Sequence, residues 1–368
     1  MSETPEKTEI KEEESENNIQ KKENTPVTKI DILDILKLVS PGTPLRIAID
    51  DITRAKTGAL VVIMSSNLHG ILEGGFKVNC KFFPQRLIEL SKMDGAVILS
   101  EDLEEILYSN VLLIPNPKIS SSETGTRHKA AERTAKQANT LVIAISQRRD
   151  RVTLYYCDTK YVLRDADEIL RRATETLQIL EKQREIYDDL ITNLNVLEVT
   201  GLVSFSDVCN LLQRTEMIIR IGELIRKSII ELGKEGNIVK MRLRELTKNV
   251  ERTEQMILKD YSNKPERIKE LISGISFDDL IDTEGISKLL FNKASNEMIQ
   301  PKGYRLLSRT NLAEADLHNF IEGFKNLNNI LNLSIEDIKN VLKDKDFSQE
   351  FQKEVKNLRE NIMVGKKI

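Results

Sequence analysis

Short apolar runs separated by polar and turn-forming residues characterise the chain between residues 30 and 162. Each run is too short for a helix and is bounded by Gly, Asp, Ser or Asn, a pattern typical of buried strands in a covered sheet. The runs lie at 45–49, 59–64, 96–99 and 141–145, with a more alternating one at 152–156 that predicts an edge or outer strand. Helical patterns occur at 32–39, 83–92 and 126–137. The region therefore predicts one α/β domain, a mixed sheet flanked by helices.

A helical pattern replaces the strand signals after residue 165. Apolar residues from Leu177 to Leu197 recur at three- and four-residue steps, which predicts a long amphipathic helix. A second helix is expected around 218–230, with glycines at 233 and 236 as its stop, and a third over 241–261.

Several short amphipathic helices are expected after Pro301, at 317–327, 335–342 and 351–362. They predict a small all-α module at the C-terminal end. The expected organisation is a tail over 1–28, an α/β domain over 29–165, an all-α helical linker over 166–300 and the small helical module over 301–368.

The composition limits which classes of protein this chain can belong to. Residues 1–28 hold eight Glu and four Lys among Ser, Thr, Asn and Pro, which is typical of a disordered acidic tail. No apolar run approaches the roughly 20 residues that span a bilayer, so no membrane partner is expected. The formal net charge of −3 does not indicate a nucleic-acid binder. Three scattered cysteines without metal-ligand spacing favour reduced thiols in a cytoplasmic protein.

One short run combines four groups that suit a phosphate. Thr126-Arg127-His128-Lys129 follows Gly125 at an expected helix start. Helix N-termini bind anions because their free N–H groups and dipole attract negative charge. Thr126 would serve as the N-cap, but capping does not require three cationic side chains at a helix end where cations are unfavourable. The run therefore predicts a phosphate-binding site.

A second signature, Met93-Asp94-Gly95-Ala96, places a lone carboxylate at the start of an apolar strand. An Asp-Gly step is often only a turn, but a carboxylate there also suits a metal ion or a hydroxyl. Gln147-Arg148-Arg149 follows the run at 141–145 and is either a ligand-binding strand end or a charged turn. The sequence has neither a P-loop motif nor Gly-x-Gly-x-x-Gly, which argues against P-loop NTPases and Rossmann enzymes. A phosphate site with one carboxylate indicates nucleotide chemistry.

Taken together, residues 36–159 resemble the diadenylate cyclase domain family. Met93-Asp94-Gly95-Ala96 matches its Asp-Gly-Ala motif, and Gly125-Thr126-Arg127-His128-Lys129 matches its Gly-Thr-Arg-His-Arg motif. Segments 131–137 and 142–149 are also similar to the family. The order of one α/β and two helical parts is similar to that of members with a C-terminal helix-hairpin-helix domain. Here residues 303–308 resemble the entry to that domain.

The resemblance implies a nucleotidyltransferase that condenses two ATP into cyclic di-AMP and two pyrophosphates with Mg²⁺ or Mn²⁺. Asp94 would hold the metal or receive the proton of a 3′-hydroxyl, and Arg127, His128 and Lys129 would stabilise the transition state. The implied ATP-binding residues are Gly95, Leu113, Thr126, Arg127, His128, Lys129 and Ala130. Two cyclase domains would face each other with the two motifs on opposite subunits' faces, so the resemblance implies a homo-oligomer, an octamer in this family.

Two departures from the family pattern stand out. Lys129 replaces the usual Arg, which keeps the charge but loses the bidentate fork and predicts weaker phosphate binding. The resemblance also implies DNA as a partner and a role in DNA damage and repair. However, the expected linker at 343–348 has no glycine, whereas helix-hairpin-helix motifs hold DNA phosphates through a glycine-containing hairpin. Two alternatives stay open: a non-enzymatic DNA-binding scaffold, and a degenerate cyclase that binds nucleotide without turnover.

Overall fold

The computed structural model describes residues 32–148, 151–342 and 345–366. The chain divides into two compact units. Of the described residues, those at 32–39 and 48–161 form an α/β unit, and those at 40–47 and from 162 onward form a helical unit. The expected acidic tail, Arg149 and residues 343–344 of the expected hairpin lie outside the described residues. Within the described ranges, no helix is long and apolar enough to cross a membrane.

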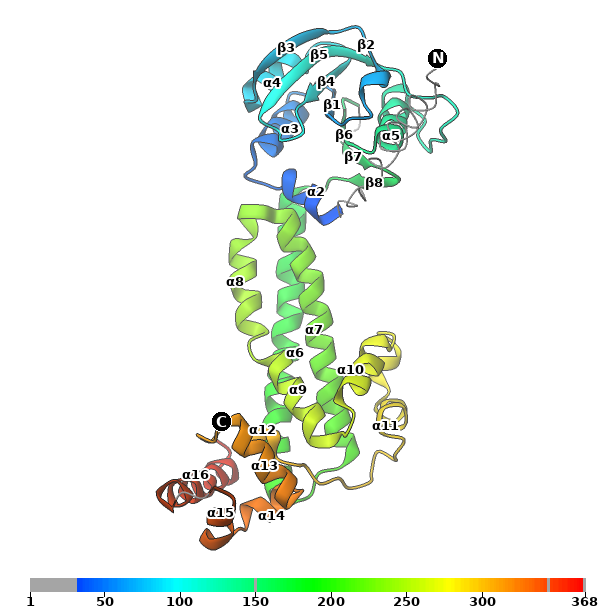
Figure 1. Cartoon of the computed structure of the whole chain (residues 1–368). Coiled ribbons are helices and arrows are strands. Elements are labelled where there is room, and N and C mark those ends of the chain that lie inside the picture. Colours follow the sequence, from blue (N-terminus) through cyan, green and yellow to red (C-terminus); the bar gives the residue numbers. More distant parts are fainter. Residues whose placement is uncertain (1–31, 149–150, 343–344, 367–368) are drawn as a thin grey trace, which may run out of the picture. The chain divides into compact units, whose positions relative to one another are not determined.

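The α/β unit contains an eight-stranded mixed sheet, as far as the described residues show (Figure 1). Its order is β2-β5-β4-β1-β6-β7-β8, and β3 pairs with β5. The strands are β1 (Ala59–Ile63), β2 (Leu72–Glu73), β3 (Phe76–Lys81), β4 (Ala96–Leu99), β5 (Glu105–Leu113), β6 (Leu141–Ser146), β7 (Arg151–Tyr156) and β8 (Thr159–Val162). Every residue of β1 and β4 is buried, so the centre of the sheet is covered on both faces, as the apolar runs predict.

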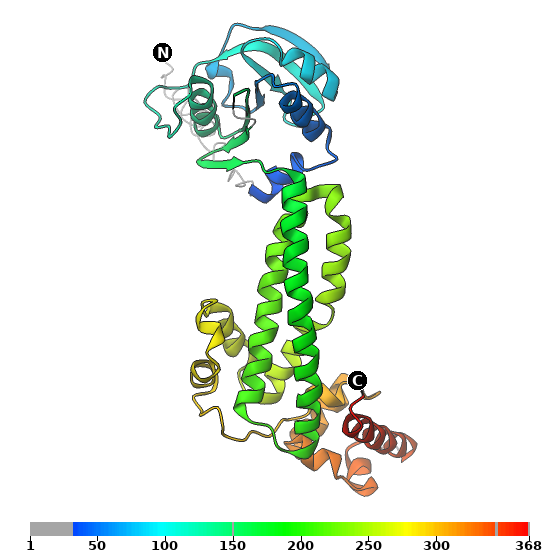
Figure 2. The same ribbon diagram turned by 180° about the vertical axis from the view of Figure 1, so that it is seen from behind.

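The helices of this unit include α5, which provides one cover of the sheet. The helices are α2 (Ile32–Leu38), α3 (Pro44–Arg54, which begins in the residues of the helical unit), the 3₁₀ turn η1 (His69–Ile71), α4 (Pro84–Leu90) and α5 (Thr126–Ala138). α5 lies against the sheet and contacts β5, β6 and β7 (Figure 2). Its Ala131, Ala135 and Ala138 share a buried core with Val62 and Val142 of the sheet. These small side chains let the helix lie close to the strands.

The prediction of a strand at 45–49 is wrong, because these residues begin helix α3. The buried apolar side chains are Leu45, Ala48, Ile49 and Ile52, at the three- and four-residue spacing of a helix face. Ile47, which a strand would bury with Leu45 and Ile49, is 46% exposed. The window of five residues was too short to reveal the repeat that continues to Ile52.

Four strands had no clear sequence signal: β2, β3, β5 and β8. β3 is largely exposed, and β5 pairs with β4 and β3 through irregular registers, so neither shows a clean apolar run. The alternating run at 152–156 forms β7, which lies between β6 and β8. It is therefore an outer strand, while β8 forms the edge.

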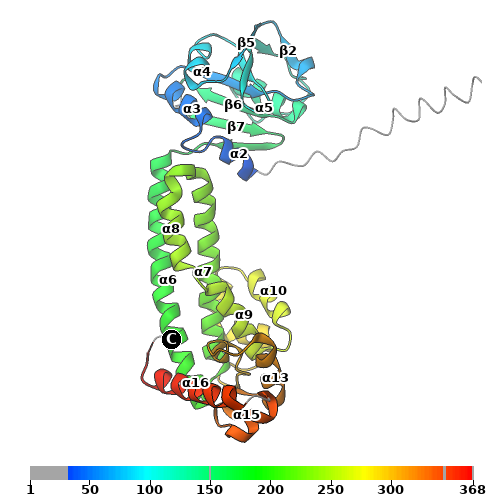
Figure 3. The same cartoon turned by 60° about the vertical axis from the view of Figure 1, so that its left-hand side comes forward.

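The helical unit is built around two long antiparallel helices, α6 (Ala166–Thr200) and α7 (Phe205–Leu232), which lie side by side (Figure 3). The predictions of both helices are confirmed. Asp165 caps α6 by accepting a hydrogen bond from the Asp167 N–H at 2.8 Å, and Gly201 ends it with φ +73°. Ser204 and Asp207 form a capping box that starts α7.

The helix expected over 241–261 is two helices, α8 (Asn237–Leu246) and α9 (Val250–Tyr261). They are separated at Asn249, whose φ of +63° ends helical continuity. Asn tolerates this left-handed backbone better than most residues, and the helical periodicity carries no mark of it. The remaining elements before residue 300 are η2 (Gly233–Gly236), α10 (Pro265–Gly274), η3 (Asp279–Ile281) and α11 (Thr283–Phe291).

The C-terminal helices share a core of their own within the helical unit. They are α12 (Tyr304–Leu307), α13 (Glu314–Phe324), α14 (Leu327–Leu331), α15 (Ile335–Leu342) and α16 (Lys345–Met363). Phe320 and Phe351 centre this core with rings 5.3 Å apart, and Val199 of α6 belongs to it. Residues 345–348 of the expected hairpin linker lie inside α16, which shortens the connection between the last two helices.

Candidate functional site

The two sequence motifs lie at the same edge of the sheet. β1 and β4 are parallel with Val61 opposite Val97, so Gly58 and the Asp94-Gly95 turn precede two neighbouring strands at the same end of the sheet. β6 is antiparallel to β1, so its C-terminal end reaches the same edge. The C-terminus of α5 leads directly into the start of β6, which puts the N-terminus of α5 at this edge as well. Neighbouring strands are about 4.8 Å apart, so the motifs converge although 30 residues separate them.

Arg127 extends from α5 toward the start of β1. A Cβ atom at Gly58 would collide with the Arg127 Nη1 atom and would also lie 3.1 Å from the carbonyl oxygen of Ile145. The missing side chain of Gly58 therefore leaves the space in which the guanidinium lies. This contact carries the positive charge of Arg127 to the strand that neighbours the Asp94-Gly95 turn.

The N-terminus of α5 is suited to an anion. Its N-cap is Gly125, one residue earlier than the expected Thr126, and among the described residues no side chain caps it. The first turn contains no acidic residue, and Thr126 is exposed whereas the next four residues are half-buried. The N–H groups of the first turn thus keep their capacity to bind a ligand.

His128 is oriented by a chain of hydrogen bonds. Its Nδ1 lies 3.0 Å from the Tyr155 hydroxyl, which donates to Glu123 Oε1 at 2.8 Å, and Lys160 pairs with the same carboxylate. Because Tyr155 gives its only hydrogen to Glu123, its oxygen accepts from His128, which fixes a proton on Nδ1. Residues of β7 and β8 thereby orient the His128 ring, Tyr155 directly and Lys160 through Glu123.

The electrostatics of this chain keep Glu123 ionised. Burial would raise the pKa of Glu123, but hydrogen bonds from Lys160 and Tyr155 outweigh it and lower the pKa below its ordinary value. Burial and the bond to Glu123 raise the pKa of Tyr155 above its ordinary value. Tyr155 therefore stays a neutral hydroxyl and a dependable donor at physiological pH.

Four side chains of α5 hold the loop that carries Glu123. Glu132 accepts from Ser121 Oγ at 2.6 Å and from the Ser122 N–H at 3.0 Å. The other three contacts are Arg133 Nε to the Ile119 carbonyl at 2.8 Å, Lys136 Nζ to the Ser120 carbonyl at 3.1 Å, and the Asn116 N–H to Gln137 Oε1 at 2.8 Å. These residues belong to segment 131–137, so its likeness to the family has a structural basis. They form the loop clamp of the site, defined as Glu132, Arg133, Lys136 and Gln137.

Asp94 and Gly95 form a tight turn before β4. Asp94 is exposed, and within the described ranges it makes no hydrogen bond or ion pair. Gly95 has φ +89°, and a Cβ there would lie 2.8 to 3.0 Å from backbone atoms of Asn110 and Val111 in β5. Only glycine fits this approach.

The other expected site residues differ in how they could contribute. Ala130 is half-buried against the core, and Lys129 is half-buried in the first turn of α5. The Leu113 side chain is buried between the sheet and α5, so any contact with a nucleotide would fall to its main chain. Arg148 is exposed after β6, at the edge shared with Asp94.

Gly58, Glu123, Tyr155 and Lys160 were not found from the sequence. Their roles depend on contacts between residues far apart in the chain. The only available signals were Gly58 immediately before an apolar strand and Glu123 two residues before Gly125.

Comparison with known proteins assigns the family. Residues 46–159 match the family model described as DisA bacterial checkpoint controller nucleotide-binding, and residues 163–299 match the model described as DisA bacterial checkpoint controller linker region. The chain belongs to the DisA family.

Relatives named DNA integrity scanning protein DisA extend this likeness over most of the chain. The Clostridioides difficile protein is 42% identical over 84% of this chain and 90% of its own length. The protein of Clostridium botulinum strain Eklund 17B is 40% identical over 92% and 98%, and that of Carboxydothermus hydrogenoformans is 45% identical over 83% and 90%. The DisA nucleotide-binding region thus coincides with the α/β unit that carries both motifs.

The described residues of this DisA-family chain contain no group of three or more His, Cys, Asp or Glu side chains that could hold a metal by themselves. A divalent ion at Asp94 would need further ligands from a bound nucleotide. Mg²⁺ is commonly held in this way, by one or two carboxylates and substrate phosphates. The single exposed carboxylate fits that donor set.

Proposed function

We propose that this chain is a diadenylate cyclase that condenses two ATP into one cyclic di-AMP and two pyrophosphates. The convergence of Arg127, the α5 N-terminus and Asp94 on one sheet edge supports it most strongly. Membership of the DisA family and of its nucleotide-binding domain agrees with this activity.

The triphosphate of ATP would bind at the start of α5. The N–H groups there and the side chains of Thr126, Arg127, His128 and Lys129 supply donors and positive charge to phosphate oxygens. Arg127 and His128 are held in place before substrate arrives, by Gly58 and by Tyr155. Preorganised charge of this kind stabilises a phosphoryl transition state without reorganisation during the reaction.

Asp94 would act on the other reacting group. Each 3′-hydroxyl oxygen forms a bond to the α-phosphorus of the other ATP, the bond from that phosphorus to the bridging oxygen breaks, and pyrophosphate leaves. The hydroxyl proton passes to Asp94 or to solvent. A bound Mg²⁺ or Mn²⁺ would neutralise phosphate charge, and Asp94 with phosphate oxygens would hold it.

The reaction needs a second copy of the chain, because each α/β unit offers one such edge. Exposed apolar side chains flank Asp94: Met93 precedes it, and Leu112 and Ile114 lie at the end of β5 that pairs with the start of β4. These side chains support a partner face at this edge. We propose a homo-oligomer, an octamer as in the family, in which the Asp94 motif and the α5 motif of facing subunits act on one pair of nucleotides.

The test is ATP turnover by the full chain with Mg²⁺ or Mn²⁺, with cyclic di-AMP and pyrophosphate measured separately. Asp94→Asn should lower product formation at least ~10²-fold while ATP still binds. Glu101→Gln, an exposed change just beyond the opposite end of β4, is the matched control and should keep full activity. Absence of product from the unchanged protein with every divalent metal, despite ATP binding, would support the degenerate cyclase instead.

Regulation by DNA is a separate question from this activity. The relatives are named for DNA integrity scanning, but after Gly303 this chain has glycines only at 323 and 365, far from the α15–α16 connection. The glycine hairpin that would hold DNA phosphates is therefore missing from the sequence. The proposed activity therefore does not depend on DNA sensing.

A further inference from the structure

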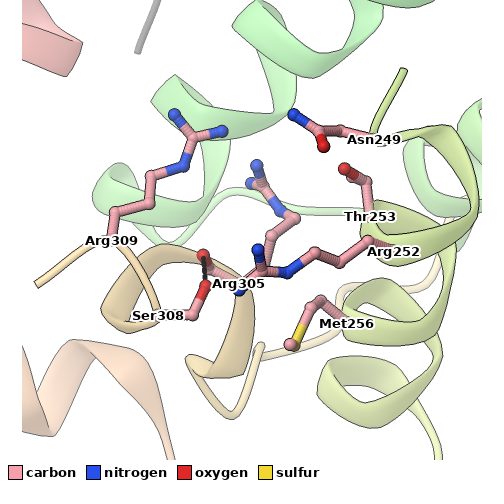
Figure 4. A pocket seen from close by; sticks show the side chains of 7 residues that line it. All are labelled: Asn249, Arg252, Thr253, Met256, Arg305, Ser308 and Arg309. Carbon is pink, nitrogen blue, oxygen red and sulfur yellow. Dashed lines mark hydrogen bonds between the residues drawn. The ribbon is translucent and has the colours of Figure 1, made fainter. Parts of the chain in front are cut away.

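A cavity of about 330 Å³ lies in the helical unit. The residues that line it are distant in sequence from both motifs. Its walls come from Asn249 and helix α9, and from α12 and the turn that follows it (Figure 4). The lining residues are Asn249, Arg252, Thr253, Met256, Arg305, Ser308 and Arg309. This volume is within the range of small-molecule sites in proteins.

The lining is strongly cationic. It contains three arginines and three neutral hydrogen-bonding residues, but no carboxylate. In the part of the chain that the structure describes, the side chains of Arg252 and Arg309 form no ion pair or hydrogen bond. Partial burial and the nearby charge of Arg305 lower the pKa of the Arg309 guanidinium. Arg305 has Glu198 as its counter-charge, but Arg252 and Arg309 have no ion-pair partner among the described residues, and a bound anion would offset the repulsion between these positive charges.

Arg305 is a built part of the wall. It is 3% exposed, and its Nη1 and Nη2 donate to Asn195 Oδ1 at 2.6 Å and Glu198 Oε2 at 2.7 Å on α6. These bonds fix the guanidinium in one orientation, while its Nε atom is buried without a hydrogen-bond partner. An unmatched buried donor is costly, so Arg305 keeps unused hydrogen-bonding capacity beside the cavity.

A smaller cavity of about 180 Å³ shares Asn249, Thr253 and Arg309 with the first. It adds Arg184 and Lys248, while the only acid in its lining is Asp188, which pairs with Arg184 at 3.0 Å. The positive region is therefore longer than one phosphate group. Guanidinium forks match phosphate oxygens in geometry, and several of them suit an anion with more than one charged group.

We propose that this arginine pocket, defined as Arg252, Arg305, Arg309 and the polar residues Asn249, Thr253 and Ser308, binds a small anion with adjacent phosphate groups. Pyrophosphate and nucleoside polyphosphates share this chemistry. The site is distinct from the sheet edge of the proposed cyclase and does not rest on that function. Because Arg305 joins α12 to α6 and lies opposite α9, an anion there would hold the C-terminal helices against the long helices.

The test measures binding of pyrophosphate to the full chain by calorimetry at physiological salt with a chelator present. All proteins carry Arg127→Gln, so that binding at the sheet edge is weakened throughout. Arg252→Gln with Arg309→Gln should weaken pyrophosphate binding at least ~10-fold, the scale of one lost charged hydrogen bond. Both side chains are free of ion pairs among the described residues, so the fold should survive. Arg244→Gln with Arg267→Gln removes the same charge from exposed positions of α8 and α10 and should leave binding unchanged.

Two further arms separate the sources of phosphate. ATP should compete with pyrophosphate in the Arg127→Gln protein, and a phosphorylated single-stranded oligonucleotide should not. Equal pyrophosphate affinity in the pocket variant and the charge-matched control would overturn the proposal. The proposal would also be overturned if the pocket variant lost binding of the oligonucleotide but kept its affinity for pyrophosphate. The pocket would then bind a nucleic-acid backbone.

Discussion

The Arg127 guanidinium lies in the space that a side chain at Gly58 would occupy. The two residues are far apart in sequence, yet this contact sets where the positive charge of α5 meets the start of β1. A change at Gly58 therefore tests the role of Arg127 without altering Arg127 itself.

Gly58→Ala should lower cyclase activity about 10-fold or more, because the new methyl group displaces a preorganised charge. Steady-state ATP turnover measures the effect. Gly70→Ala is the matched control, since a Cβ at Gly70 would meet no atom within 4 Å. Equal activity of the two variants would show that the position of Arg127 against Gly58 is unimportant for the reaction.

Tyr155→Phe should reduce kcat roughly 10-fold, a loss typical of removing a group that orients an active-site residue. The change deletes the bonds to His128 and Glu123 but keeps the buried ring and the Glu123–Lys160 pair. Because His128 loses its fixed orientation, the pH profile of kcat should change as well. Tyr108→Phe, on β5 of the same unit, should leave both unchanged. A Tyr155→Phe protein with a normal kcat and pH profile would contradict the role assigned to the chain.

Lys129→Arg should lower the KM for ATP severalfold, since it restores the two-pronged contact with phosphate oxygens. The change adds no charge, so any gain reports geometry. Initial rates over a range of ATP concentrations give KM and kcat separately. Activity that rises from none to measurable would identify the present protein as a degenerate cyclase.

Gly95→Ala should destabilise the α/β unit by about 1–3 kcal/mol, the cost of backbone strain at one residue. The left-handed backbone and the close atoms of Asn110 and Val111 both oppose a side chain. Gly74→Ala is the matched comparison, because Gly74 also has positive φ but open space around it. Urea unfolding of both variants separates the steric contact from the backbone preference. A similar loss in both would mean that the approach to β5 contributes little.

The helical unit should lose stability as pH rises from about 4 to about 7. Burial and the charge of Glu198 raise the pKa of Asp260 from an ordinary 3.8 to about 7. In this window the folded chain holds the proton more tightly than the unfolded chain, so the free energy of unfolding falls with increasing pH. Urea unfolding followed by the helical circular dichroism signal at pH 5, 6, 7 and 8 measures this fall.

Asp260→Asn should flatten this dependence, because the side chain no longer titrates. It should also destabilise the unit at every pH, since Asp260 accepts the N–H groups of Gly303, Tyr304 and Arg305 and an amide cannot accept all three equally well. A pH dependence that persists in the variant would assign the titration to another group.

Local chemistry in the sequence was enough to predict the proposed anion site and the carboxylate turn. Three cationic side chains at a helix start and one Asp-Gly step before an apolar strand are readable without knowing the fold. The long helices α6 and α7 were readable too, because their periodicity persists over many turns. The strand order was not readable, so the parallel pairing that brings Gly58 and the Asp94-Gly95 turn to the same end of the sheet stayed hidden.

Residues that depend on tertiary contacts could not be predicted. Tyr155 has the pattern of any strand residue until its hydroxyl meets His128 and Glu123. The segment from Leu45 to Ile49 has the composition of a strand. Only the apolar repeat that continues to Ile52 shows that the segment is a helix with one buried face. The break at Asn249 likewise requires a backbone angle that periodicity does not report.

The loop clamp on α5 has a consequence for how mutations in this protein would be interpreted. Glu132, Arg133, Lys136 and Gln137 bind the segment that leads to Glu123, and none of them belongs to the phosphate site proposed at the start of α5. Without these contacts Glu123 would leave its position. Tyr155 and then His128 would lose the hydrogen bonds that orient them. A screen scored only by product would rank these four positions beside the residues proposed to bind ATP. Measurements of loop order, such as amide exchange at Ser122, would separate residues that hold the loop in place from residues that take part in the reaction.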